Sequence, residues 1–220
     1  MNKLDMSSAA RFAEFGKKIV AVGRNYSEHA KELGNAVPAE PILFLKPTTS
    51  YITKGSPIIL PKGANELHHE VELGVIISKK CKDISAADAL SHIAGCTVAL
   101  DMTDRVKQTE LKNKGLPWSV AKGFDTSCPV GDFTPLSSMP KSLQALDIWL
   151  KVNNETKQSG NTKDMIFSVP DLVSYISGIF TLEPGDLVLT GTPAGVGPVK
   201  SGDVITAGIE GCPNIEYYIK

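Results

Sequence analysis

Residues 70–78 constrain the fold most, because they form an apolar strand with two carboxylates built into it. Side chains alternate between the two faces of a strand, so residues two apart share a face. Glu70 and Glu72 are therefore expected on one face, opposite Val71, Leu73, Val75 and Ile77. Like charges held side by side repel each other, and a divalent cation relieves the repulsion by binding both oxygens. The alternative is an antiparallel strand with one solvated face.

A third acid, Asp101, lies near the end of another expected apolar strand, residues 97–102. A carboxylate is costly to bury there without partners. Together with Glu70 and Glu72 it would complete a site of three carboxylates, and hard oxygen ligands of this kind suit Mg²⁺, Mn²⁺ or Ca²⁺ and not zinc. The alternative role of Asp101 is to cap the helix that follows it.

Length and composition fit one folded domain over residues 1–220, with a short N-terminal segment over residues 1–17. The formal net charge of -1 leaves no basic excess for binding nucleic acid. No apolar run reaches the ~20 residues that span a bilayer, and no secretory signal follows Met1. The four cysteines, none in a Cys-x-x-Cys pair, predict reduced thiols and an intracellular location, in the cytosol or the mitochondrion.

Strands outnumber helices in the predicted element order, and the βαβ alternation of a doubly wound sheet is missing. The pattern predicts strands at residues 18–22, 42–45, 57–60, 70–78, 97–102, 147–152, 156–158, 187–190 and 203–209. Short helices are predicted at residues 8–15, 26–33, 85–93, 104–114 and 168–180. The turn Asn153-Asn154 predicts a hairpin between two of the strands. A mixed or antiparallel β core with short peripheral helices fits this order best.

His29 and Glu32 stand three apart on a predicted helix, so they share one of its faces. A carboxylate beside an imidazole fixes the tautomer of the ring and raises its basicity, which is the arrangement of a base that activates water. The alternative is an exposed helix with a charged surface pair.

Arg105 and Gln108 share a helical face shortly after Asp101, and Arg can bind a carboxylate through two parallel hydrogen bonds. Lys122 is a single lysine in an apolar stretch, where it could stabilise developing negative charge. Its alternative place is the edge of a strand, with the ammonium group reaching solvent.

A glycine-rich turn over residues 189–197 follows a predicted strand. It matches neither a P-loop nor a dinucleotide-binding fingerprint. Its backbone N–H groups, that of Gly191 among them, and the hydroxyl group of Thr192 could hold a small anion.

Together these segments resemble the fumarylacetoacetate hydrolase family, in the family's order and over nearly the whole chain. The matching pieces are residues 22–26 with His29, 69–73, 100–103, 114–118 with 121–122, 165–167, and 190–193 with 195–197. The resemblance is greatest to the branch of acylpyruvases and oxaloacetate decarboxylases. It implies an α+β, mainly β fold, a mixed β-sandwich roll with short peripheral helices, which forms a homodimer and uses Mg²⁺ or Mn²⁺.

The resemblance also implies roles for individual residues. Glu70, Glu72 and Asp101 match the family's metal ligands, and His29 and Glu32 match a catalytic dyad carried on a lid. The positions that match substrate contacts are Arg105, Gln108, Lys122 and Thr192. After Thr103 the family usually has Ala-Arg-Asp-Val-Gln, so Asp104 and Val106 are unusual, and the departure bears on how Arg105 is positioned.

The implied substrates are small 2-oxo acids, and one site could host three reactions through an enolate-like species. These are the hydrolysis of acylpyruvates, the decarboxylation of oxaloacetate and the keto–enol tautomerisation of oxaloacetate. A binding protein for metal and 2-oxo acid, with no turnover, is the alternative from another class.

Overall fold

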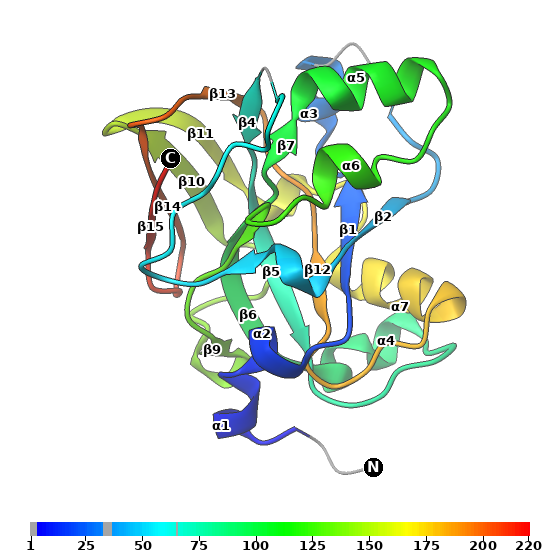
Figure 1. Ribbon diagram of the computed structural model, residues 1–220. Helices are drawn as coiled ribbons and strands as arrows, with labels where there is room; N and C mark the ends of the chain where they lie inside the picture. The colour runs from blue at the N-terminus through cyan, green and yellow to red at the C-terminus, as the bar shows by residue number, and fades with distance from the viewer. Residues whose placement is uncertain (1–3, 33–36, 65) are drawn as a thin grey trace.

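The protein is built around a mixed six-stranded β-sheet (Figure 1). This computed structural model describes residues 4–32, 37–64 and 66–220, and only the backbone of residues 29–31. The strand order is β2 (Ile42–Lys46), β1 (Ile19–Gly23), β12 (Leu187–Leu189), β5 (Val71–Ile77), β6 (Ile93–Leu100) and β9 (Thr134–Pro135). β1 and β12 run parallel, and the other neighbouring pairs run antiparallel. The predicted mixed β core is confirmed.

A second, antiparallel sheet packs against the first and lies to the left in Figure 1. Its strand order is β11 (Glu155–Asn161), β10 (Asp147–Val152), β14 (Val204–Ile209) and β15 (Ile215–Tyr218). The predicted hairpin joins β10 to β11, and the φ angles of Asn153 and Asn154 are 51° and 65°. Both angles are positive, as the tightest hairpin turn requires, and asparagine tolerates such angles better than most residues.

Strand β5 is buried along its whole length, on both of its faces. One face, with Leu73 and Val75, belongs to the larger hydrophobic cluster, which includes Ile148 of β10. Ile76 on the other face belongs to a smaller cluster that Phe12 and Val130 help to close. The alternative of a solvated strand face is therefore wrong, and any acid on this strand lies in the interior.

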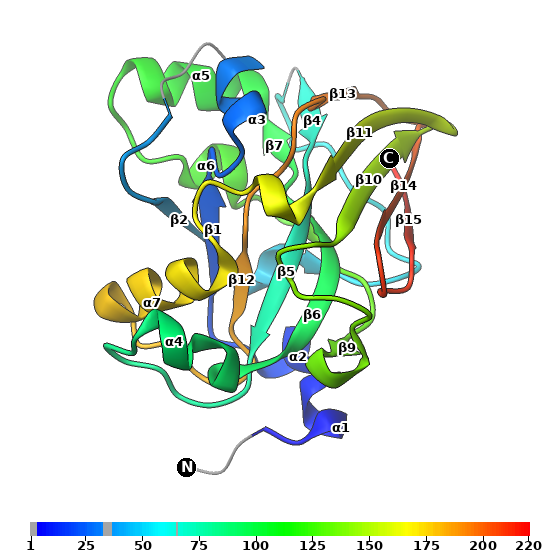
Figure 2. The ribbon, with the colours of Figure 1, turned by 180° about the vertical axis from the view of Figure 1, so that it is seen from behind.

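Short helices lie towards opposite ends of the six-stranded sheet (Figures 1 and 2). At the top of both views are α3 (Ser27–Glu32), α5 (Arg105–Asn113) and α6 (Ser119–Lys122). Towards the other end, α4 (Ala86–Ala89) packs beside α7 (Val169–Ile179), with α2 (Phe12–Phe15) near the same height and α1 (Met6–Ala9) below. The smaller pieces are β3 (Tyr51–Ile52), β4 (Leu67–His69), β7 (Thr103–Asp104), β8 (Cys128–Pro129) and β13 (Gly197–Val199), with 3₁₀ turns at Thr48–Ser50, Leu90–His92, Leu136–Ser138 and Thr162–Asp164.

Some predicted elements differ from the observed ones. The helix over residues 8–15 is two short helices, because Arg11 between them leaves helical geometry at φ -105° and ψ 21°. Residues 57–60 form no strand; Ile58 alone makes a bridge, with Ile219. The helix over residues 85–93 is α4 followed by a 3₁₀ turn. No helix among the described residues has the length and apolarity needed to cross a membrane.

Candidate metal centre and substrate pocket

Three carboxylates from neighbouring strands converge inside the protein. Glu70 immediately precedes β5, Glu72 lies within it, and Asp101 immediately follows β6. One donor oxygen from each lies within 4.8 Å of the others, and the three residues are only 5%, 2% and 1% exposed. Because β5 and β6 pair in register, with the N–H of Asp101 donating to the carbonyl of Glu70 at 2.9 Å, the acids share one face of the sheet.

The electrostatics of this cluster favour the binding of a cation at Glu72. The pKa of Glu72 is raised well above 4.5, first by burial and then by the charges of Asp101 and Glu70. Only the N–H of Gly191, which donates to Glu72 at 2.7 Å, opposes this among backbone groups. Three clustered carboxylates are hard ligands for a divalent cation, and binding such a cation requires that Glu72 give up its proton.

Two buried lysines, Lys46 and Lys122, partly balance the acids. The Nζ of Lys122 lies 2.9 Å from Glu70 and 2.5 Å from Asp101, and the Nζ of Lys46 lies 2.5 Å from Asp101. Burial lowers the pKa of Lys122, but its ion pairs with Asp101 and Glu70 outweigh burial, and the net shift is upward. Lys122 is the buried last residue of helix α6, so its alternative place at a strand edge is wrong.

Lys46 is a site residue that the sequence reasoning missed. It ends β2 with 1% exposure and also donates to the backbone carbonyl of Lys122. The sequence feature that could have indicated Lys46 is its place at the end of the apolar run of residues 42–45, directly before Pro47.

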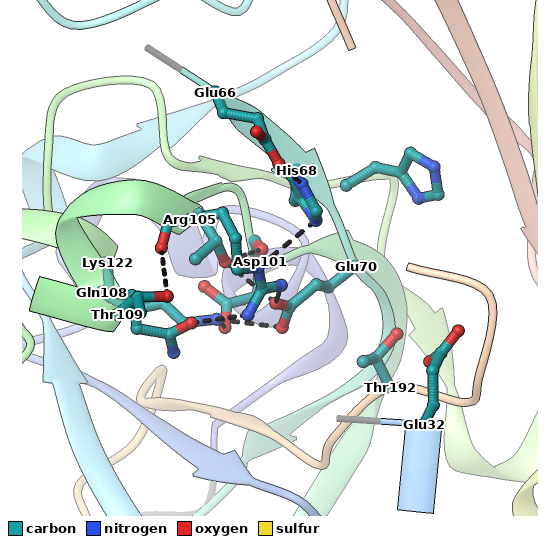
Figure 3. A network of polar contacts seen from close by, with 12 residues as sticks. Glu32, Glu66, His68, Glu70, Asp101, Arg105, Gln108, Thr109, Lys122 and Thr192 are labelled. Atoms are coloured by element: carbon teal, nitrogen blue, oxygen red, sulfur yellow. Dashed lines mark hydrogen bonds and ion pairs between the residues drawn. The ribbon is translucent and has the colours of Figure 1, made fainter. Parts of the chain in front are cut away.

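Arg105 joins the first turn of α5 to the metal centre. It donates to Glu70 and to the Oε1 of Gln108, each at 2.5 Å, and to the Nδ1 of His68 at 3.3 Å (Figure 3). Because Gln108 uses its oxygen here, its amide N–H groups stay available as donors. Asp104 caps this helix by accepting the N–H of Lys107 at 3.0 Å. The unusual Asp104 therefore starts the helix that carries Arg105, and the alternative that Asp101 caps it is wrong.

A pocket of about 240 Å³ opens beside the three carboxylates. Phe44 and Trp118 form part of its wall, with their rings 5.8 Å apart. Its polar lining includes the three acids and the side chains of Arg24, Arg105, Gln108, Lys112, Lys122 and Thr192. A cavity with a hard-ligand cluster at one side and several cations around it fits a small anionic molecule.

The buried side chain of Gln158 fixes the turn that carries Thr192. Its Nε2 donates to the hydroxyl of Thr192 at 2.7 Å and to the carbonyl of Pro193 at 2.9 Å. Its Oε1 accepts from the N–H of Val71 and from the Nδ1 of His69, each at 3.0 Å. The hydroxyl of Thr192 accepts from Gln158 and so keeps its own proton to donate towards the pocket. Nothing in the sequence marked Gln158, which lies on the hairpin strand β11.

Glu32 ties helix α3 to the same glycine-rich turn. Both oxygens of this exposed carboxylate accept from the N–H of Gly195, at 3.0 and 3.2 Å, and Figure 3 shows Glu32 beside Thr192. The backbone of His29 lies in α3, while its side chain lies outside the described part of the chain. The pairing of His29 with Glu32 therefore stays a prediction.

Fold and site together define a mixed β protein with a buried carboxylate centre suited to a divalent cation, next to a basic pocket for a small anion. The model of the fumarylacetoacetate (FAA) hydrolase C-terminal family matches residues 18–220. The chain belongs to this family.

Relatives and solved structures match nearly the whole chain. An oxaloacetate decarboxylase, mitochondrial, of Dictyostelium discoideum is 55% identical over 202 residues, which cover 91% of this chain and 92% of the relative. The oxaloacetate tautomerase FAHD1, mitochondrial, of Bos taurus is 51% identical over 96% of this chain and 95% of its own. The crystal structure of a fumarylpyruvate hydrolase from Pseudomonas aeruginosa, in complex with Mn²⁺ and pyruvate, matches with a TM-score of 0.88 and 36% identity, over 93% of this chain and 89% of that one.

Proposed function

We propose that this chain is a divalent-metal-dependent enzyme that acts on small 2-oxo acids, hydrolysing acylpyruvates and decarboxylating oxaloacetate to pyruvate. The buried cluster of Glu70, Glu72 and Asp101 carries the proposal, because its three carboxylate oxygens lie close enough together to bind one divalent cation. The names of the relatives support the substrate class, as does a similar structure that holds Mn²⁺ and pyruvate.

The proposed cofactor is Mg²⁺ or Mn²⁺, held by Glu70, Glu72 and Asp101. The donor set fits either ion, since it consists of carboxylate oxygens alone. When bound, the ion supplies Lewis acidity towards the C1 carboxylate and C2 carbonyl oxygens of the substrate.

The basic and polar groups of the pocket position the substrate. Arg105 lies beside the metal ligands, and its contact with Gln108 fixes the amide so that its N–H groups can donate to a carboxylate. From the other side, Thr192 donates its hydroxyl proton, because Gln158 already supplies the hydrogen bond that its oxygen accepts. The ammonium group of Lys122 stays charged beside Asp101 and Glu70 and stabilises negative charge that develops on the substrate.

In acylpyruvate hydrolysis, His29, oriented by Glu32, takes a proton from water, and the water oxygen adds to the distal carbonyl carbon. The bond between C3 and C4 then breaks, and the pyruvate half leaves as an enolate that regains a proton at C3. In oxaloacetate decarboxylation the C4 carboxylate leaves as carbon dioxide, and no attacking water is needed.

The alternative function is oxaloacetate keto–enol tautomerisation, which the name of the Bos taurus relative favours. It moves one proton between C3 and the C2 oxygen and breaks no carbon–carbon bond. Following the decay of enol oxaloacetate alongside carbon dioxide release separates the two reactions, because a tautomerase accelerates the first without the second.

A panel of short 2-oxo acids tests the proposal, assayed with Mg²⁺ or Mn²⁺ and again with a chelator. We expect turnover of oxaloacetate and acetylpyruvate that a chelator stops and added metal restores. Turnover that persists after complete removal of metal would exclude the carboxylate cluster as the catalytic centre. Binding of metal and oxalate without any turnover would instead indicate the binding protein.

We further propose a homodimer, from the family resemblance, and a mitochondrial location, from the names of the relatives. Light scattering during gel filtration tests the first, since a mass near 23.5 kDa would indicate a monomer. Imaging of a C-terminally tagged full-length chain tests the second.

A further inference from the structure

We propose that Cys96 and Cys212 form a site of reversible oxidation, at which a hydroperoxide converts their two thiols into a disulfide that ties the two sheets together. This inference is independent of the proposed function, because neither cysteine lines the pocket beside the carboxylates. Cys96 lies in β6 of the six-stranded sheet, and Cys212 lies in the turn between β14 and β15 of the second sheet (Figure 1).

The sulfur atoms of the two cysteines are in contact. They lie 3.6 Å apart, although 116 positions separate the residues along the chain. All four cysteines of the protein are described as free thiols, and Cys96 and Cys212 are the two of them that contact each other. A disulfide bond needs a separation of about 2.05 Å, so a short further approach joins them.

The two thiols differ in their access to solvent. Cys96 is fully buried, whereas Cys212 is partly exposed and lies between two exposed residues, Gly211 and Pro213. A dissolved oxidant therefore reaches Cys212 first, and Cys96 reacts with whatever forms on Cys212. An accessible thiol next to a second, resolving thiol is the arrangement that favours disulfide formation.

The acidities of the thiols assign the same roles. The hydrogen bond with Cys96 lowers the pKa of Cys212 and outweighs burial, and the same hydrogen bond raises the pKa of Cys96. Burial raises the pKa of Cys81 to about 11 and that of Cys128 to about 12. The thiolate is the nucleophilic form, so Cys212 is the reactive thiol of the four.

Strand β6 holds Cys96 in place. Cys96 pairs with Val75 of β5 on one side and with Thr134 of β9 on the other. The Sδ of Met139 lies 3.4 Å from its Sγ and packs against it inside the larger hydrophobic cluster. Because the backbone on both sides of Cys96 is paired, the approach of the sulfur atoms has to come from Cys212.

The turn that carries Cys212 is built to lie close to this strand. Gly211 has a φ of 87°, and a Cβ atom there would lie 2.4 Å from the Cδ of Pro140. Glycine thus lets the turn pack directly on Pro140. The N–H of Cys212 donates to the carbonyl of Ile209 at 2.9 Å, which places the cysteine just after β14.

The reaction balances with a hydroperoxide as the oxidant. The thiolate sulfur of Cys212 attacks one peroxide oxygen, the O–O bond breaks, and the other oxygen leaves as water or an alcohol. The sulfur of Cys96 then attacks the sulfenic acid of Cys212, an S–S bond forms, and the hydroxyl group leaves as water with the proton of the Cys96 thiol. The two sulfur atoms give up the two electrons that reduce the peroxide, and a dithiol reverses the reaction by exchange.

The disulfide would join the two sheets across most of the chain. A bond between residues 116 positions apart restricts the unfolded chain strongly, and so it favours the folded state. Oxidation should raise the midpoint of urea unfolding on the order of 1 M.

The test treats the full-length, reduced protein with hydrogen peroxide, alkylates the remaining free thiols and identifies the peptides by mass spectrometry. We expect the chain to lose two hydrogen atoms, a disulfide-linked pair of peptides that contain Cys96 and Cys212, and recovery of both thiols with dithiothreitol. Cys212 should react at least about 10-fold faster than Cys128, whose thiol is buried.

Substitutions separate the roles of the two thiols. Cys96→Ser should leave Cys212 as a sulfenic acid that dimedone captures, and Cys96→Ala serves the same purpose if serine disturbs the core. Cys212→Ser should leave Cys96 unreactive and remove the rise of the urea midpoint, whereas Cys128→Ser, the matched control, should keep both the disulfide and the rise.

Three outcomes would overturn the proposal. The first is that Cys96 and Cys212 are still free after peroxide has oxidised other residues. The second is a disulfide from Cys212 to another chain, seen as a doubled mass under denaturing conditions without reductant. The third is a disulfide between Cys96 and Cys212 that leaves the urea midpoint unchanged, which would remove its role as a tie between the sheets.

Discussion

The metal side of the site comes from neighbouring strands in the middle of the sheet, whereas its helix side is the six-residue helix α3, which meets the glycine-rich turn at Gly195. On the metal side, Glu72, Asp101 and Lys122 are each no more than 2% exposed. On the helix side, Glu32 is exposed and reaches the rest of the site through the N–H of Gly195.

The difference follows from what each side has to do. Charges that bind a cation must be close together and away from competing water, so the paired strands β5 and β6 hold them within an interior that cannot relax. A group that acts on water must instead be reached by water and substrate, and a short surface helix allows this. If this division is right, variants on the metal side lose the metal, and variants on the helix side lose turnover alone.

The largest effect is expected from Glu72→Gln. This variant should lower Mn²⁺ affinity on the order of 100-fold and abolish turnover, because ligand charge sets affinity at oxygen sites. The unfolding free energy of the metal-free protein should not fall, since burial and the charges of Asp101 and Glu70 raise the pKa of Glu72 and glutamine removes that unfavourable charge. Calorimetry and urea unfolding with chelator measure the two quantities. Unchanged Mn²⁺ affinity would remove Glu72 from the metal site.

Lys122→Met should be the next most severe change. It leaves Glu70 and Asp101 buried without their shared ammonium group, which costs about 3–5 kcal/mol of unfolding free energy. Lys17→Met, which removes an exposed ion pair with Glu183, is the matched control and should cost far less, because solvent screens that pair. Urea unfolding compares them, and equal losses would contradict the role given to burial.

Glu32→Gln should slow acetylpyruvate hydrolysis about 100-fold, because Glu32 orients His29 and a correctly positioned general base contributes at least that much. Mn²⁺ affinity should stay within about twofold of wild type, since Glu32 belongs to the helix side. Glu28→Gln, on the same helix, is the control and should keep most of the rate. A loss of Mn²⁺ affinity in Glu32→Gln would contradict the expectation that variants on the helix side lose turnover alone.

The smallest effect concerns His69, which links the two sides through Gln158. Burial lowers its pKa below 6.5, so the folded protein holds it neutral while the unfolded chain takes up a proton first. This stability is fully present above pH about 6.5 and is lost as the pH falls, by about 1 kcal/mol per pH unit. With chelator, His69→Asn should lose less unfolding free energy than wild type between pH 6.5 and 5.5. Equal losses in the two proteins would show that groups other than His69 cause the acid sensitivity.

Features that depend on local periodicity were predictable. The alternation along residues 70–78 placed Glu70 and Glu72 on one face, and Ser168 followed by Pro170 gave the start of α7. The pair Asn153-Asn154 gave the hairpin. In each case the deciding interaction lies within a few residues along the chain.

Features that depend on which segments meet were not predictable in this way. Lys46 becomes a site residue because β2 ends where the carbonyl of Lys122 and the carboxylate of Asp101 lie, 55 or more positions along the chain. Gln158 matters because the second sheet brings it against Val71 and Thr192. No pattern in the sequence around Lys46 or Gln158 indicates which distant segments these residues contact.

The sequence by itself determined which residue types face each other along a strand or helix, because strand and helix periods are fixed by backbone geometry. It thereby gave three acids able to bind a cation. Only the tertiary structure decided that β5 is covered on both faces, that two lysines are buried against those acids, and that Cys96 and Cys212 lie in contact. Burial and charge balance depend on the packing of distant segments, which no single stretch of sequence contains.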